Sequence, residues 1–203
     1  MKHPDPFTES VRRAEQDAIR SAAGNCSGLR VLDAASFRVE FVPPLQDATL
    51  TVQPNPEQPL SVPPGSFDCA ISAQVLSHMP GPDRRSAYLR EVARTLKPDG
   101  RLIVTAMHFS FRFRNKGASK EGWEGADYFN RFLPEEFRSE LDPYFTIEQM
   151  HGFWIYLPKT FPIYMSLGRW SVYWERALRN LPLSLKYGKF LLAVCRPKSV
   201  EAA

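Results

Sequence analysis

The stretch that decides the fold runs from Gly65 to Met107 and reads GSFDCAISAQVLSHMPGPDRRSAYLREVARTLKPDGRLIVTAM. After Asp68 comes a short apolar run, Cys69-Ala70-Ile71, of the length typical of a buried strand that ends at Ser72. A helix is indicated next, because apolar side chains recur at i, i+3, i+4 and i+7, namely at Leu89, Val92, Ala93 and Leu96. The apolar run at residues 102 to 104 predicts a second buried strand. This order predicts a βαβ unit with parallel strands and a right-handed crossover.

The helix carries boundary signals at both ends. Asp83 stands where an N-cap belongs, just after the Gly81-Pro82 turn. The segment Lys97-Pro98-Asp99-Gly100 combines a cationic last turn with a proline and a glycine, and this combination predicts the end of the helix. Elsewhere we expect a helix over residues 7–23, a strand over 48–52, a flexible loop over 116–125, a helix from Pro134 and a final strand over 190–195.

These motifs resemble the class I S-adenosylmethionine-dependent methyltransferases, specifically the small type 11 group. The resemblance is carried by Phe67-Asp68, the segment 72–79, the helix 84–96 and the turn 97–100 with the strand that follows. It implies an α/β fold, with a reduced Rossmann-like sheet that is mostly parallel and has helices on both faces. It also implies S-adenosylmethionine as the cofactor. Family members usually carry a glutamate before the histidine, and this chain has Ser77 there.

The length of 203 residues fits one domain over 1–203, with a methyltransferase-like core over 28–150. Apolar residues make up 43% of the chain and charged residues 24%, which indicates a globular protein. The three cysteines are far apart, so we expect buried thiols and neither a disulfide framework nor a metal site. A polar N-terminus and the lack of a long apolar run predict a cytoplasmic protein, with peripheral membrane contact left open.

The loop that binds the cofactor in the resembled family departs from its pattern here. When the motif D-x-G-x-G-x-G is aligned on Asp33, its glycines fall at Ala35, Phe37 and Val39. Each added Cβ disfavours positive φ and fills space that a ligand would need. The loop is therefore degenerate.

The second cofactor element is also altered. In the family, the second strand ends in an acidic residue that accepts hydrogen bonds from the ribose, and this position is Gln53 here. A glutamine accepts such a bond without charge assistance, so weaker binding is expected. Only 33 residues separate Asp33 from Phe67, which is too few for three crossovers and two strands, so one βα unit has been shortened or lost. Five prolines between Gln53 and Gly65 predict an extended, nonhelical segment.

Six site residues are predicted, five of them from the resemblance and His108 from its position after a strand. Cofactor binding falls on Asp33, Ala35, Gln53, Ser72 and Gln74, although Gln74 is equally well explained as a helix cap. His108 follows a strand at the end where open α/β sheets bind ligands, so it is a candidate general base, with a buried or loop histidine as the alternative. Nucleic-acid binding is not expected, because the Phe and Arg residues that follow His108 form only one short segment.

The C-terminal quarter mixes aromatic and basic residues. Ten aromatics lie between Phe153 and Phe190, and residues 153–198 contain eight basic residues and one acid, Glu175. We expect an aromatic-rich helical insertion over 153–188, before the last strand. Three interpretations stay open for Phe153 to Lys189: a lid that packs on the core, a membrane surface, or a protein partner site.

Two functions follow. The first is S-adenosylmethionine-dependent methyl transfer to a small-molecule, lipid or glycan acceptor. The second is a pseudo-methyltransferase that keeps the fold without the cofactor and acts as a binding or scaffolding subunit. A cavity beside Ala35 and Gln53 favours the first, and a cavity filled by Phe37 and its neighbours favours the second.

Overall fold

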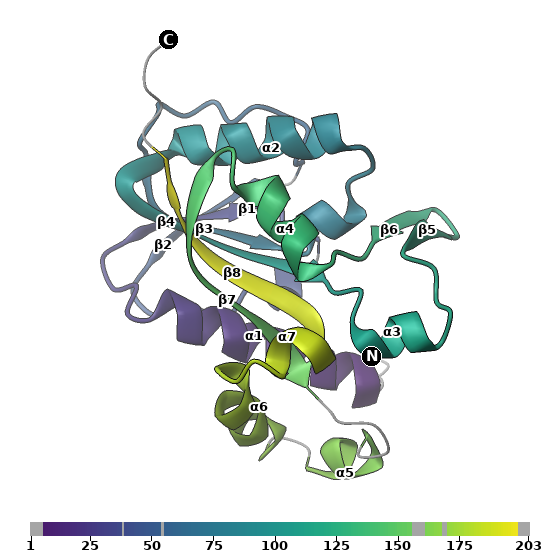
Figure 1. Cartoon of the computed structure of the whole chain (residues 1–203). Coiled ribbons are helices and arrows are strands. Elements are labelled where there is room, and N and C mark those ends of the chain that lie inside the picture. The colour runs from purple at the N-terminus through teal and green to yellow at the C-terminus, as the bar shows by residue number, and fades with distance from the viewer. Residues whose placement is uncertain (1–5, 38, 54, 156–160, 168–169, 199–203) are drawn as a thin grey trace.

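A six-stranded sheet forms the centre of the computed structural model, which describes residues 6–37, 39–53, 55–155, 161–167 and 170–198 (Figure 1). In spatial order the strands are β2 (Thr49–Gln53), β1 (Arg30–Ala34), β3 (Phe67–Ala73), β4 (Leu96–Met107), β8 (Gly188–Pro197) and β7 (Phe145–Ile155). The first four strands are parallel, and β8 runs antiparallel to both of its neighbours. The predicted mostly parallel α/β sheet is confirmed.

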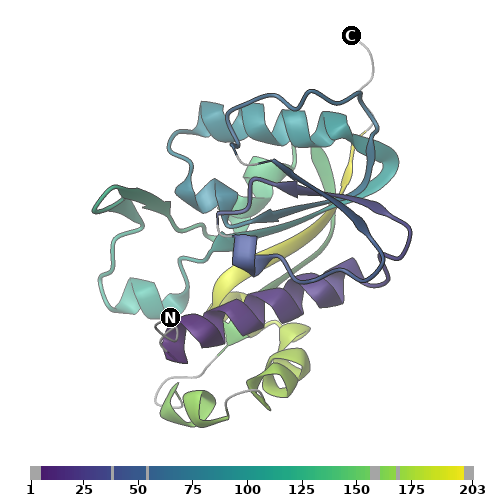
Figure 2. The ribbon, with the colours of Figure 1, turned by 180° about the vertical axis from the view of Figure 1, so that it is seen from behind.

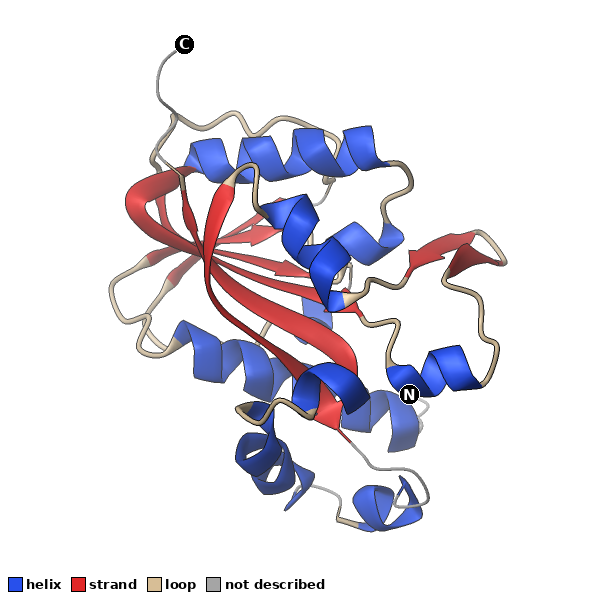
Figure 3. Ribbon diagram, in the orientation of Figure 1, coloured by secondary structure: helices blue, strands red, loops and turns tan. Residues whose placement is uncertain are grey.

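Helices cover both faces of this sheet (Figure 2, Figure 3). The longer ones are α1 (Pro6–Ala23) and α6 (Ser171–Arg179) on one face, and α2 (Pro82–Thr95) and α4 (Pro134–Leu141) on the other. The shorter ones are α3 (Phe111–Asn115), α5 (Phe161–Ser166) and α7 (Ser184–Tyr187). The apolar stripe of α2 buries Leu89 and Val92, while α1 buries Ala18 and Ile19 on the opposite side. The helices α5, α6 and α7 form the predicted insertion before the last strand.

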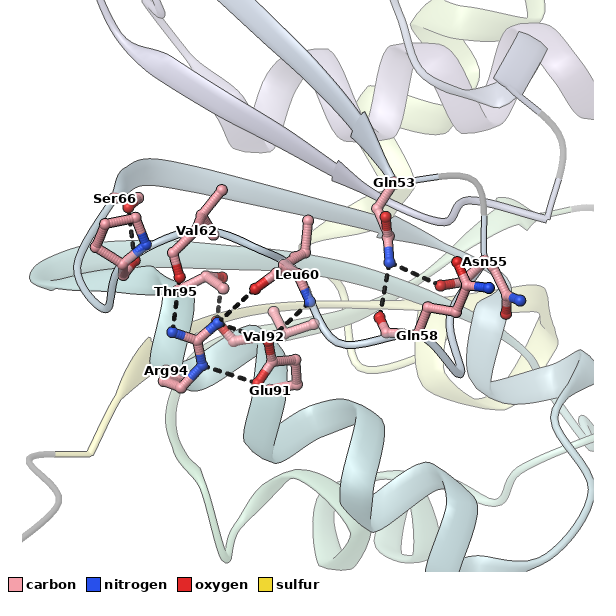
Figure 4. A network of polar contacts seen from close by, with 11 residues as sticks. Gln53, Asn55, Gln58, Leu60, Val62, Ser66, Glu91, Val92, Arg94 and Thr95 are labelled. Atoms are coloured by element: carbon pink, nitrogen blue, oxygen red, sulfur yellow. Dashed lines mark hydrogen bonds and ion pairs between the residues drawn. The ribbon is translucent and has the colours of Figure 1, made fainter.

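The half of the sheet that starts at β1 is reduced, as predicted. In the described part of the connection from β1 to β2, the only helical element is a short 3-10 helix, η1 (Val39–Phe41). After β2, residues 55–66 form an extended strap along α2 (Figure 4). Arg94 donates to two strap carbonyls at 2.9 and 3.1 Å, and Glu91 accepts from the amide of Leu60 at 3.0 Å. The strap stands in place of the missing βα unit, and none of its residues is helical.

The start of α2 differs from the prediction. The N-cap is Gly81, which has φ 84°, and the helix begins at Pro82. Proline suits the first helical position because its φ is already fixed near the helical value and its missing N–H would be unpaired there. Asp83 therefore lies inside the first turn, and its prediction as the N-cap is wrong.

The loop predicted over residues 116–125 is ordered at its C-terminal end. There β5 (Glu121–Glu124) pairs antiparallel with β6 (Asp127–Asn130). The rings of Trp123 and Tyr128 pack edge to face at a centroid distance of 5.4 Å. Such aromatic cross-strand pairs stabilise two-stranded ribbons. The hairpin lies beside the carboxyl ends of β3 and β4, where it forms part of the site (Figure 1).

Candidate functional site

The turn after β1 is held tightly against β3. The carboxylate of Asp33 accepts a hydrogen bond from the amide of Ser36 at 3.0 Å, and burial raises its pKa. The hydroxyl of Ser36 accepts from the amide of Ala73 at 3.0 Å. Ala35, the position of the family's first glycine, has φ 56° and so takes the left-handed conformation that glycine adopts more easily. The backbone path of a glycine-rich turn is therefore kept without the glycine.

A tyrosine joins the end of β1 to Ser72, one of the predicted cofactor residues. The hydroxyl of Tyr88 donates to the carbonyl of Ala34 at 2.6 Å and lies 2.7 Å from the hydroxyl of Ser72. Asp33, Ala35 and Ser72 lie at or just after the carboxyl ends of the neighbouring strands β1 and β3, and their cofactor roles stay predictions. Tyr88 was missed, because it lies within the helical pattern of α2 and looks like a core residue.

Phe37 forms a wall with His78. The two rings are stacked with centroids 3.4 Å apart and planes 9° apart. The amide of Phe37 donates to the carbonyl of Ala73 at 2.9 Å, which fixes the backbone from which the ring projects. The Nδ1 atom of His78 donates to the carbonyl of Tyr128 at 2.8 Å. Phe37 thus projects into the region that glycine would leave open.

Two cavities share this wall. The larger, which we call the aromatic cavity, has a volume of about 420 Å³. Its aromatic lining consists of Phe7, Phe37, Phe41, Tyr128, Phe129 and Phe190. The smaller, of about 280 Å³, is lined by residues that include Ala35, Asn55 and Met79. The stack of Phe37 on His78 lines both cavities and separates them.

Gln53 and Gln74 are turned toward other partners. The amide nitrogen of Gln53 donates to the carbonyls of Asn55 at 2.9 Å and Gln58 at 2.7 Å, so it is used within its own loop (Figure 4). Gln74 has φ 61° and does not cap the following 3-10 helix with its side chain. Its amide nitrogen donates instead to Glu15 of α1 at 2.5 Å. The cofactor roles of both glutamines stay predictions.

His108 lies apart from these residues. It lines a separate cavity of about 300 Å³, and its Nδ1 donates to the carbonyl of Gly188 at 2.7 Å. Burial lowers the pKa of His108 to about 4, so the ring is neutral at pH 7. The structure does not bring it together with Ala35 or Gln74. Its catalytic role stays a prediction.

Lys189 is a residue of the aromatic cavity that the sequence did not single out. It lies in β8 between the buried residues Gly188 and Phe190. Burial lowers the pKa of Lys189 to about 8. The available signal was a charged residue in an otherwise apolar strand.

The C-terminal insertion packs on the domain and also exposes aromatic side chains. Asp17 of α1 accepts from Arg179 at 2.9 Å and from Arg176 at 2.7 Å. Trp170 and Tyr173 are stacked on each other and exposed. Residues 156–160 and 168–169 of the predicted surface lie outside the described residues. No helix within the described residues is long and apolar enough to cross a membrane.

The sequence matches a known family over its N-terminal half. Residues 23–104 match the model of the methyltransferase domain family. A ubiquinone biosynthesis O-methyltransferase from Xanthomonas oryzae pv. oryzae is 36% identical over 70 residues, which are 34% of this chain and 26% of that protein. The match thus spans about a quarter of the curated relative's length.

Solved structures match nearly the whole chain. A methyltransferase from Thermotoga maritima, described as a possible histamine N-methyltransferase, has a TM-score of 0.59 at 16% identity, with 95% of this chain and 93% of that chain covered. The 1,6-didemethyltoxoflavin-N1-methyltransferase of Burkholderia thailandensis, solved with its substrate and S-adenosylhomocysteine, has a TM-score of 0.54 at 17% identity, with 96% and 81% covered. At these identities the similarity shows the fold. The chain is thus similar to the methyltransferase domain family in sequence over residues 23–104, and to S-adenosylmethionine-dependent methyltransferases in fold over nearly its whole length.

Proposed function

We propose that this protein transfers a methyl group from S-adenosylmethionine to a small molecule bound in the aromatic cavity. The observation that carries the proposal is the position of the cavity at the carboxyl ends of β3 and β4, beside the turn after β1. Ligands of open α/β sheets bind at such ends. The volume of about 420 Å³ is within the range of small-molecule sites. Solved proteins of the same fold are described as S-adenosylmethionine-dependent or contain S-adenosylhomocysteine, and this supports the choice of cofactor.

The backbone of the turn after β1 suits this cofactor. The Phe37 ring occupies space in the cavity wall beside the turn. Asp33, Ala35 and Ser72 would contact the cofactor at this turn, because Ala35 already has the left-handed backbone conformation there. Binding requires the ring of Phe37 to leave its stack on His78. The ring is 37% exposed, so it has solvent into which it can swing.

The protein's contribution to catalysis is positioning. When bound, S-adenosylmethionine supplies an activated methyl group on a positively charged sulfur. The aromatic walls of the cavity would orient a planar acceptor and exclude water from it. Methyl transfer depends chiefly on in-line geometry, so the proposal does not require a general base.

Calorimetric titration with S-adenosylhomocysteine and S-adenosylmethionine tests the proposal. Wild-type protein should bind with a micromolar dissociation constant, which corresponds to about −8 kcal/mol. Phe37→Ala should bind several-fold more tightly, because the closed state no longer competes. The control Phe129→Ala removes a ring that lines only the aromatic cavity and should not give this gain. Lack of binding to both wild type and Phe37→Ala at millimolar ligand would refute cofactor use.

A second candidate function is a ligand-binding protein without cofactor. It is favoured by the Gln53 amide, which is used within its own loop where family members present a carboxylate. The stack of Phe37 on His78 favours it as well, because it separates the cavities that one elongated cofactor would join. Binding of small molecules in the aromatic cavity without any binding of S-adenosylhomocysteine would support this candidate.

A further inference from the structure

The ammonium of Lys189 lies among aromatic rings at the aromatic cavity. Its Nζ is 4.5 Å from the ring centroid of Phe7, 4.8 Å from that of Trp154 and 5.5 Å from that of Phe190. These rings come from α1, β7 and β8, which lie far apart in the sequence. Cation–π contacts of this length are attractive, but they leave the three N–H donors of an ammonium without acceptors.

The surrounding charges do not neutralise Lys189. Burial lowers its pKa, and the nearby cations Arg131 and Arg112 lower it further. The cavity also contains Glu124 and Asp127 of the β5–β6 hairpin. Glu124 interacts electrostatically with Arg131. Within the part of the chain that the structure describes, no carboxylate forms an ion pair with Lys189. The lining thus holds two carboxylates and two cations, and neither carboxylate is paired with Lys189.

This arrangement is unusual for a lysine with a purely structural role. A surface lysine normally packs its methylenes on apolar groups and extends its ammonium into water. A withdrawn cation is costly unless an anion pairs with it. Lys189 is instead withdrawn into a cavity of about 420 Å³ that is open to a ligand.

The ring beneath Lys189 is rigidly placed. Trp154 has φ 55°, which is rare for a bulky residue, and it is fully buried. Its indole nitrogen donates to the hydroxyl of Ser10 at 2.9 Å, and its ring packs edge to face on Phe7 at 5.1 Å. Strained residues held by their surroundings are typical of binding sites. One of the rings that contact the ammonium is therefore held in place before a ligand arrives.

We propose that Lys189 binds the anionic group of a planar aromatic ligand, a carboxylate or phenolate, in the aromatic cavity. The charge recognises the anion, and the rings of Phe37, Phe41 and Phe129 provide flat apolar surface for the rest of the molecule. The identification of this ligand as the methyl acceptor rests on the proposed function. The anion-binding role of Lys189 does not depend on it.

The test compares 2-naphthoate with its neutral amide, 2-naphthamide, by calorimetry on the full chain. Wild type should bind the carboxylate at least about tenfold more tightly than the amide, as expected for a charge-assisted hydrogen bond. Lys189→Met should remove this preference, and Lys189→Arg should keep part of it. The matched control is Lys186→Met, because Lys186 also lies over aromatic rings, at 5.1 and 5.4 Å, but lines the cavity of His108. Thermal unfolding establishes that each variant is folded.

Equal affinity for carboxylate and amide, no binding of naphthoate at millimolar concentration, or an unchanged preference in Lys189→Met would overturn the inference. A parallel titration with S-adenosylhomocysteine separates it from the proposed function. Naphthoate binding without S-adenosylhomocysteine binding would support this anion site and refute the proposed methyl transfer. Competition between the two ligands would assign Lys189 to the cofactor's own carboxylate and overturn the aromatic acid.

Discussion

Replacement of Glu15 by glutamine should change how the stability of the protein depends on pH. Glu15 is fully buried in α1, and its two oxygens accept from Thr105 at 2.5 Å and from Gln74 at 2.5 Å. Burial raises its pKa from 4.5 to about 7. No cation pairs with it among the described residues, and the two hydrogen bonds offset only part of the desolvation.

The magnitude follows from this shift. Because the pKa of Glu15 is higher in the folded than in the unfolded protein, the folded protein binds more protons between pH 4.5 and 7. The stability from this group is fully present below pH 4.5 and is lost as pH rises through 7. A shift from 4.5 to about 7 corresponds to about 3 kcal/mol of stability lost at pH 8. The neutral amide of Glu15→Gln avoids this loss.

Denaturant unfolding of wild type and Glu15→Gln at several pH values from 4.5 to 8.5 measures the effect. The difference between the two proteins isolates Glu15, because His108 and His151, whose pKa values burial lowers to about 4, contribute equally to both. This difference should grow by about 1.4 kcal/mol per pH unit between pH 5 and 7, in favour of the variant. The control Glu9→Gln, on an outer turn of α1 where Arg12 lowers the pKa of Glu9, should show no such growth. A pH-independent difference for Glu15→Gln would refute the reasoning.

Further predictions concern the way the C-terminal elements dock. Asp17→Asn leaves the buried guanidinium of Arg179 without its carboxylate and should lower the free energy of unfolding by about 3–5 kcal/mol, whereas Glu9→Gln should change it by less than about 1 kcal/mol in the same urea titration. Gly152→Ala would place a Cβ 2.0 Å from the carbonyl oxygen of Ser184, so we expect a loss of more than about 3 kcal/mol, and a midpoint equal to wild type would contradict this packing.

The part of the fold that sequence predicts well is the part with local signals. The stretch from Gly65 to Met107 carries its apolar runs and its helical stripe within short windows, and the structure has β3, α2 and β4 there. The loss of a βα unit also follows from chain length alone. The path of the strap was beyond the sequence, since it depends on Arg94 and Glu91, some 30 residues away along the chain.

The candidate site was predicted only in part, because several site residues contact partners that lie far away in the sequence. Asp33, Ala35 and Ser72 come together because adjacent parallel strands end at one edge. Gln74 lines the aromatic cavity, but its side-chain amide donates to a buried carboxylate on α1, 59 residues earlier in the chain. Lys189 was not recognised as a site residue, because its neighbours Phe7 and Trp154 come from α1 and β7, which meet β8 only in the folded protein.

The direction of the Phe37 side chain shows most clearly what the sequence alone does not predict. The sequence indicates that a phenylalanine replaces a glycine of the cofactor loop, and it predicts a conflict. Whether the ring turns inward depends on His78, whose ring accepts the stack because the carbonyl of Tyr128 fixes its Nδ1. That carbonyl belongs to β6, the second strand of a hairpin whose first strand, β5, falls within the predicted loop over residues 116–125.

The cavity also explains why α1 is held so firmly. Phe7, Thr8 and Val11 of α1 line the aromatic cavity, so any movement of this helix changes the site. Three buried polar contacts fix it: Ser10 to the Trp154 ring, Glu15 to the ends of β3 and β4, and Asp17 to α6. The last of these links the C-terminal insertion to the cavity through the body of α1. The insertion therefore supports one wall of the aromatic cavity through α1. The Asp17 contact that gives this support does not involve the exposed side chains of Trp170 and Tyr173.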